Sequence, residues 1–126
     1  MSGERVLVVE DNQLNMKLLR DVLRRSGYDV LEATTGRSAL RLATQQAPAL
    51  VLMDVRLPDL DGVEALRRLR KEALTAAIPV LAVTAQAMER DRDRLLAAGF
   101  DGYISKPVDV VALVAMVKRH CAGALD

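Results

Sequence analysis

The sequence predicts an α/β fold in which a mainly parallel sheet of five strands is covered by helices on both faces. Short apolar runs rich in Val, Leu and Ile alternate with longer segments of helical period along the chain. Glycine or proline stands between most of these segments and marks their ends. The run 49–53 contains no polar residue, which is typical of a strand buried on both faces. Strict alternation of strands and helices then requires parallel strands joined by right-handed crossovers.

Each predicted strand is a short, largely apolar run, and the five runs are 5–9, 29–33, 49–53, 78–83 and 103–105. The second run contains Asp29 and Glu32, so we expect it at an edge of the sheet, where charged residues are tolerated. Pro79 lies near the start of the fourth run, where its missing N–H costs little. The third run is the most apolar and is therefore expected at the centre.

Each predicted helix is a longer amphipathic, charged or apolar segment, and the five segments are 13–26, 36–47, 61–73, 88–98 and 110–121. In the first segment Leu19 and Leu23 share one face, as an amphipathic helix requires. Asp61 begins the third with Glu64 three residues later, which predicts a capping box. Residues that end helices follow the first, second and fourth segments, and these are Gly27, Pro48 and Gly99.

Composition narrows the class of protein. The chain has 126 residues, of which 51% are hydrophobic and 28% charged, and this is typical of one soluble globular domain. A net charge of +1 creates no electrostatic field strong enough to attract nucleic acid. No apolar run is long enough to insert into a membrane. The single cysteine, Cys121, permits no disulfide within the chain. We expect a cytoplasmic protein with one domain over 1–126, its core at about 4–121, and no output domain.

Polar residues follow or end four of the predicted strands, and these are Glu10, Asp11, Asp54, Thr84 and Lys106. The carboxyl ends of parallel strands meet at one edge of a sheet, so these side chains are expected to converge there. At an effective dielectric of 20, each close pair of carboxylates repels by up to about 4 kcal/mol, more than one lysine offsets. A divalent cation would relieve this repulsion. Oxygen ligands in small number favour Mg²⁺, which keeps several waters.

Four segments resemble the receiver domain of bacterial two-component response regulators: Val8–Asn12, Met53–Gly62, Val83–Ala85 and Gly99–Pro107. The resemblance extends over nearly the whole chain, and residues 9–18 and 103–107 are further similar to single-domain regulators of the cell cycle. It implies the doubly wound (βα)5 arrangement of flavodoxin and CheY, with strand order 2-1-3-4-5. It also implies a signalling protein rather than an enzyme acting on a separate substrate.

The resemblance implies a role for each polar residue at the strand ends. Asp54 would be the phosphoacceptor, which attacks a phosphohistidine on a histidine kinase or a histidine phosphotransferase. Glu10 and Asp11 would hold Mg²⁺ together with Asp54 and the backbone carbonyl of Arg56. Thr84 and Lys106 would bind oxygens of the phosphoryl group, the lysine as a point charge. The output would be protein–protein contact that depends on phosphorylation.

Other positions matter for switching. The resemblance implies that Tyr103 turns inward as Thr84 moves, although Tyr103 is also compatible with a half-buried aromatic residue at the sheet edge. Pro107 fits a cis peptide bond with Lys106. Arg56 and Gln86 lie two residues beyond Asp54 and Thr84, at positions that tune dephosphorylation in the family.

Two further questions remain open from the sequence. An acidic α/β site is also compatible with a magnesium-dependent phosphatase or hydrolase. Phosphatases of the haloacid dehalogenase type, however, need Asp-x-Asp, and here Arg56 occupies the second position and cannot donate a proton. The run 110–117 is apolar throughout, so the last helix either exposes apolar residues without consequence or forms a docking face for a partner or a second copy.

Overall fold

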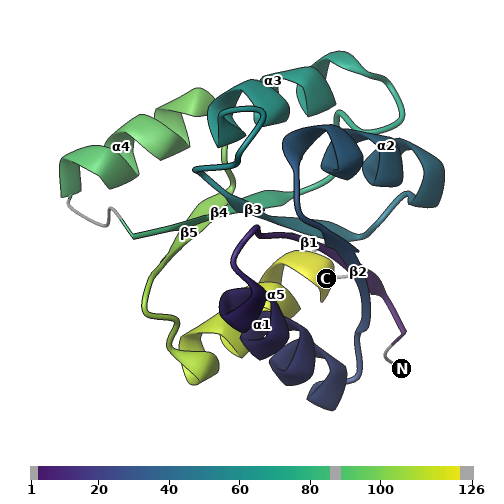
Figure 1. Ribbon diagram of the computed structural model, residues 1–126, viewed down its shortest axis with the longest axis vertical. Coiled ribbons are helices and arrows are strands. Elements are labelled where there is room, and N and C mark those ends of the chain that lie inside the picture. The colour runs from purple at the N-terminus through teal and green to yellow at the C-terminus, as the bar shows by residue number, and fades with distance from the viewer. Residues whose placement is uncertain (1–2, 86–88, 123–126) are drawn as a thin grey trace.

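The computed structural model describes residues 3–85 and 89–122, and in it five parallel strands form a single sheet (Figure 1). The strands are β1 (Arg5–Val9), β2 (Asp29–Ala33), β3 (Leu50–Asp54), β4 (Val80–Thr84) and β5 (Gly102–Ser105). Their order is β2-β1-β3-β4-β5, which confirms the predicted topology. The charged run, β2, lies at one edge as expected, and β3 lies at the centre.

Helices cover both faces of the sheet. They are α1 (Gln13–Arg25), α2 (Gly36–Gln46), α3 (Gly62–Lys71), α4 (Glu89–Ala98) and α5 (Val110–Ala122). Helices α1 and α5 pack on one face, and α2, α3 and α4 pack on the other (Figure 1). None of these helices is long and apolar enough to span a bilayer.

Side chains of successive strand residues point to opposite faces of the sheet, so they fill two separate hydrophobic cores. Val6 and Val8 of β1 face α1 and α5, where they pack with Leu19 and Leu113. Leu7 and Val9 face the other way and pack with residues of α2, α3 and α4. Every residue of β3 and β4 is buried, which explains why these two runs are almost entirely apolar until their last residue.

Some element boundaries differ from the sequence prediction. Strand β4 begins at Val80 rather than residue 78, because Pro79 has no N–H and contributes only its carbonyl, which accepts from the Val51 amide at 3.0 Å. Helix α3 ends at Lys71 rather than 73, since Glu72 is extended (φ −92°, ψ 131°). The Thr75 hydroxyl then donates to the Leu69 carbonyl at 2.6 Å and closes the turn that follows.

The predicted capping box of α3 is wrong in its second half. Asp61 does cap the helix, because its carboxylate accepts from the Val63 amide at 2.7 Å. Glu64 instead directs its two oxygens to Arg67 and Arg68, at 2.9 and 3.1 Å. These arginines follow Glu64 by three and four residues, so they compete for its carboxylate within the first turns.

Candidate functional site

The carboxylates of Glu10, Asp11 and Asp54 converge at the carboxyl edge of the sheet. Each offers a ligand oxygen, and these atoms lie within 4.8 Å of one another. Glu10 directly follows β1 and Asp54 ends β3, its neighbour in the sheet, so the topology itself brings them together. Glu10 and Asp54 are buried, at 1% and 6% exposure, whereas Asp11 is exposed. All three residues line a cavity of about 430 Å³.

Lys106 provides the ammonium group of the site. Its Nζ lies 3.0 Å from Glu10 Oε1 and 3.3 Å from Asp54 Oδ2. Strand pairing sets this position, because the Lys106 amide donates to the Thr84 carbonyl at 2.8 Å just beyond the β4–β5 ladder. The peptide bond from Lys106 to Pro107 is cis. One ammonium group therefore faces two of the three carboxylates.

Burial governs the charges at this site. Burial raises the pKa of Glu10, and the nearby Asp54 carboxylate raises it further. The Lys106 ammonium and the Asn12 amide lower this pKa, but by less, so it stays above its usual value. For Lys106, burial lowers the pKa, but Glu10 and Asp54 outweigh burial and raise it overall. Glu10 Oε1 is fully buried, and the Lys106 ammonium 3.0 Å away forms an ion pair with it. A buried carboxylate oxygen that already pairs with a cation is a fitting ligand for a metal ion.

The Asp54 carboxylate is held on both oxygens. Oδ1 accepts from the Arg56 amide at 3.0 Å, and Oδ2 faces Lys106. Gly62 makes room behind it: its amide donates to the Val55 carbonyl at 2.8 Å, and a Cβ at Gly62 would lie 2.7 Å from the Asp54 carbonyl oxygen. The first turn of α3 thus touches the backbone of Asp54 at a position that only glycine allows.

The remaining predicted residues lie around this group. Thr84 is buried at the end of β4 and lines the same cavity. Tyr103 is half-buried on the edge strand β5, a place compatible with both interpretations drawn from the sequence. Arg56 is exposed and lines the cavity. Gln86 lies outside the described residues.

Sequence reasoning missed Asn12. Its amide donates to Glu10 Oε2 at 3.1 Å, and its side chain accepts from the Asn15 amide at 3.0 Å and caps α1. The signal was an asparagine directly before an amphipathic helix, which is a favoured cap. One residue therefore joins the start of α1 to a buried carboxylate of the site.

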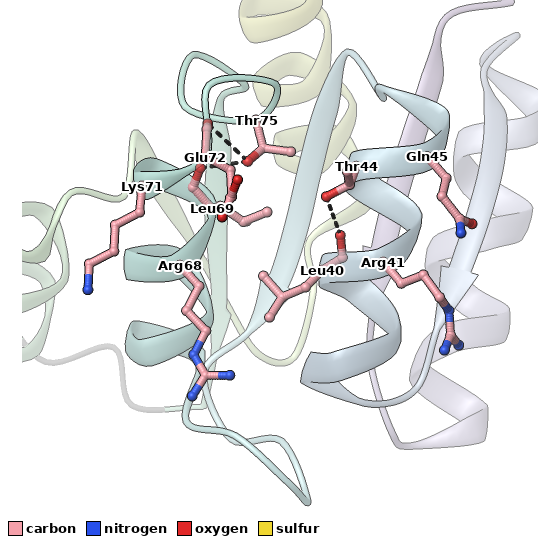
Figure 2. Close-up of a pocket in the computed structure, with 9 residues that line it drawn as sticks. All are labelled: Leu40, Arg41, Thr44, Gln45, Arg68, Leu69, Lys71, Glu72 and Thr75. Atoms are coloured by element: carbon pink, nitrogen blue, oxygen red, sulfur yellow. Dashed lines mark hydrogen bonds between the residues drawn. The ribbon is translucent and has the colours of Figure 1, made fainter.

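A second hollow, of about 490 Å³, lies between α2 and α3 (Figure 2). Leu40 of α2 and Leu69 of α3 line it, together with Arg41 and Lys71. Its one acidic side chain is Glu72, so it has no group of carboxylates that could hold a metal. The chemistry-bearing groups lie instead at the strand ends.

Comparison with known proteins identifies a family. The sequence profile described as "Response regulator receiver domain" matches residues 6–118. The chain is 42% identical over 119 residues to the polar-differentiation response regulator DivK of Brucella ovis, a match that covers 94% of this chain and 97% of that protein. DivK of Brucella anthropi matches with the same identity and coverage.

Solved structures agree with the sequence matches. The receiver domain of the sensor histidine kinase PA1611 from Pseudomonas aeruginosa, determined with a magnesium ion coordinated in its active-site cleft, superposes with a TM-score of 0.88 at 37% identity. That match covers 95% of this chain and 98% of the other. The chemotaxis response regulator CheY4 of Vibrio cholerae superposes with a TM-score of 0.88 at 25% identity, covering 94% and 98%.

Proposed function

Because the chain belongs to the response regulator receiver domain family, we propose that Asp54 accepts the phosphoryl group and that Glu10, Asp11, Asp54 and the Arg56 carbonyl hold Mg²⁺. A receiver domain is a phosphoacceptor signalling protein, and its phosphodonors are histidine kinases. The observation that carries the proposal is the convergence of three carboxylates within 4.8 Å of one another beside a single ammonium group.

The donor set fits magnesium. All the candidate ligands are hard oxygens, and they are few, so water would complete the octahedral shell that Mg²⁺ requires. Bound Mg²⁺ would neutralise the carboxylates and the oxygens of the incoming phosphoryl group. One ammonium group shared between Glu10 and Asp54 leaves excess negative charge among the three carboxylates, and this gives the chain a specific reason to bind a cation here.

Phosphoryl transfer then follows from the geometry of Asp54. Its carboxylate opens onto the cavity, and one oxygen attacks phosphorus while the bond from phosphorus to the donor imidazole breaks. The leaving imidazole takes a proton from water, and an acyl phosphate remains on Asp54. Lys106, already 3.3 Å from Asp54 Oδ2, neutralises one oxygen of the new group, and the Thr84 hydroxyl donates to another.

Signalling follows from the added charge. We propose that Thr84 moves toward the phosphoryl group, that Tyr103 follows it, and that a partner protein detects the change. Arg56 and Gln86 would set the lifetime of the acyl phosphate. The similarity to DivK favours a DivK-like role in the control of the cell cycle.

The partner surface is proposed on α5. Val110 and Val111 are 43% and 79% exposed, so the outer face of this helix is partly apolar. We propose that this face docks a histidine kinase, a phosphotransferase or a second copy of the chain. Sedimentation with and without an acyl-phosphate mimic tests the homodimer, and a monomer in both states contradicts it.

Acetyl phosphate provides the direct test of the site. With Mg²⁺ the protein should gain the mass of one phosphoryl group, and the group should be labile in base. Asp54→Asn or excess EDTA should abolish the gain, whereas Asp29→Asn, an exposed aspartate on β2, should leave it intact. Label that survives Asp54→Asn would place the acceptor elsewhere.

A further inference from the structure

The loop between β3 and α3 is attached to α2 through Asp59. Helix α2 begins at Gly36, and its first amides have no partner within the helix. Thr35 caps one of them, because its hydroxyl accepts from the Ser38 amide at 3.1 Å. Asp59 accepts the other two: Oδ1 from the Gly36 amide at 2.7 Å and Oδ2 from the Arg37 amide at 3.0 Å.

The same loop carries the backbone of the site. Its base is closed by the bond from the Gly62 amide to the Val55 carbonyl and by an isolated antiparallel bridge between Arg56 and Asp61. From this base the Arg56 amide donates to Asp54 Oδ1 at 3.0 Å. Any displacement of the loop would therefore move an atom that contacts the proposed phosphoacceptor.

A second contact holds the loop against α2. Leu60 packs on Gly36 so closely that a Cβ at Gly36 would lie 2.8 Å from the Leu60 Cβ. Two hydrogen bonds to the Asp59 carboxylate and the packing of Leu60 thus hold the loop against the first turn of α2. The loop tip is attached to a helix that belongs to a different part of the sequence.

We propose that Asp59 is a positioning residue for the magnesium site. Its attachment to α2 holds the Val55–Asp61 loop so that the main chain of Arg56 faces Asp54 and the cation. The proposal rests on the proposed function, since it requires that the acidic site bind Mg²⁺.

The charge of Asp59 suits this task. Desolvation raises the pKa of Asp59, but the amides of Gly36 and Arg37, together with those of Asp59 itself and Leu60, outweigh it and hold the pKa below its usual value. Asp59 is therefore ionised at neutral pH, and a carboxylate is favoured at a helix N-terminus. The Arg37 side chain adds little, because it is 77% exposed and 3.8 Å away.

If Asp59 only capped α2, its loss would affect the stability of that helix and not the metal site. A variant of Thr35, which also caps α2, distinguishes this possibility from the positioning role. Thr35 caps the same helix turn, and its hydrogen bonds remain within that turn. Asp59→Ala and Thr35→Ala should both lower the melting temperature, as loss of a cap does. Only Asp59→Ala releases the loop.

The test is a titration of ¹⁵N-labelled protein with MgCl₂, followed by NMR. We expect Asp59→Ala to raise the Kd for Mg²⁺ by roughly tenfold, the scale observed when a group that orients a metal ligand is lost, and to shift the Arg56 amide resonance. Thr35→Ala should leave both unchanged. Asp59→Asn keeps one acceptor oxygen and should give an intermediate Kd.

Each outcome decides the question. The positioning role is refuted if Asp59→Ala and the wild type have the same Kd for Mg²⁺, or if Thr35→Ala weakens Mg²⁺ binding as much as Asp59→Ala does. Either result would leave the proposed function standing. A wild-type protein that does not bind Mg²⁺ at the carboxylates would instead remove the proposed function, and this inference with it. If Asp59→Ala does not fold, Asp59→Asn decides the question, because it weakens the same two hydrogen bonds, and an unchanged Kd in that variant also refutes the proposal.

Discussion

Asp11→Asn should make the metal-free protein more stable and remove most of its response to Mg²⁺. Asp11 is exposed and makes no ion pair with the residues that the structure describes, whereas ligand oxygens of Glu10 and Asp54 lie within 4.8 Å of its own. Asparagine keeps the size of the side chain and removes the charge. The variant therefore relieves repulsion from Glu10 and Asp54 and at the same time weakens the proposed metal site.

The structure sets the magnitude of this effect. Two unit charges 4.8 Å apart, the limit for these ligand atoms, repel by about 0.9 kcal/mol in water and by about 3.5 kcal/mol at an effective dielectric of 20. Because Asp11 is exposed, the lower value applies to each of its two pairs, and the Lys106 ammonium beside Glu10 and Asp54 offsets part of it, so about 2 kcal/mol is the upper bound. For a domain of this size that bound corresponds to a rise in Tm of at most roughly 10 °C.

Urea unfolding, measured in EDTA and again in MgCl₂, provides the assay. Mg²⁺ at ten times its Kd should stabilise the wild type by about 1.4 kcal/mol, and most of this gain should vanish in the variant. Asp29→Asn, an exposed aspartate on β2 outside the acidic group, is the matched control and should change neither quantity. If Asp11→Asn is no more stable than wild type in EDTA, or gains as much from Mg²⁺, the electrostatic reasoning fails.

Three other variants or probes test neighbouring features. Lys106→Met should lower the metal-free stability by about 3 kcal/mol in urea, because it leaves the buried Glu10 beside Asp54 with no cation; an unchanged midpoint would refute this. Gly62→Ala should lower the free energy of unfolding by about 1–3 kcal/mol and slow phosphorylation by acetyl phosphate, because its Cβ would lie 2.7 Å from the Asp54 carbonyl oxygen. A variant with the stability and the phosphorylation rate of the wild type would refute this close contact. Burial raises the pKa of the Cys121 thiol to about 11, so at pH 8 it should react with a disulfide reagent far more slowly in the native than in the unfolded protein. The same shift makes the fold lose stability as the pH rises from about 9 toward 11, and a flat stability over that range would contradict it.

The convergence of the acidic residues was predictable because it depends on topology. Asp54 ends an apolar run and Glu10 follows another, and parallel pairing of β1 with β3 places both at one edge. The sequence pattern also predicts which strand is central, since every residue of β3 is buried. In these places local pattern and tertiary structure agree, because strand pairing alone decides which residues meet.

Capping was harder to predict, because several side chains compete for the same groups. Glu64 matched the capping-box pattern, yet Arg67 and Arg68 take its carboxylate. The capping box that does form joins Thr35 to Ser38, and a serine in that position does not fit the usual Glu or Gln signature. The sequence shows which residues can donate or accept, but the neighbours on the helix surface decide which pairs form.

The Asp59 attachment could not be predicted locally, since its partners lie 22 and 23 residues earlier in the chain. Asp59 follows Leu57 and Pro58, and this context predicts only a turn. The contact exists because α2 and α3 pack side by side on one face of the sheet (Figure 1), which brings the start of α2 next to the loop between β3 and α3. Residues that orient a site through a neighbouring element leave no signature within their own segment.

The electrostatics of the site connects its stability to its function. In the metal-free protein Lys106 is shared between Glu10 and Asp54, and this ion pair partly offsets the repulsion among three carboxylates. A phosphoryl group on Asp54 would add negative charge directly beside the Lys106 ammonium, which would then have to leave Glu10 or Asp54 to neutralise it. Without a cation the buried Glu10 would have to take up a proton, so we expect phosphorylation and Mg²⁺ binding to favour each other. Reciprocity then requires that the acyl phosphate tighten Mg²⁺ binding by the same factor by which Mg²⁺ favours the phosphorylated state.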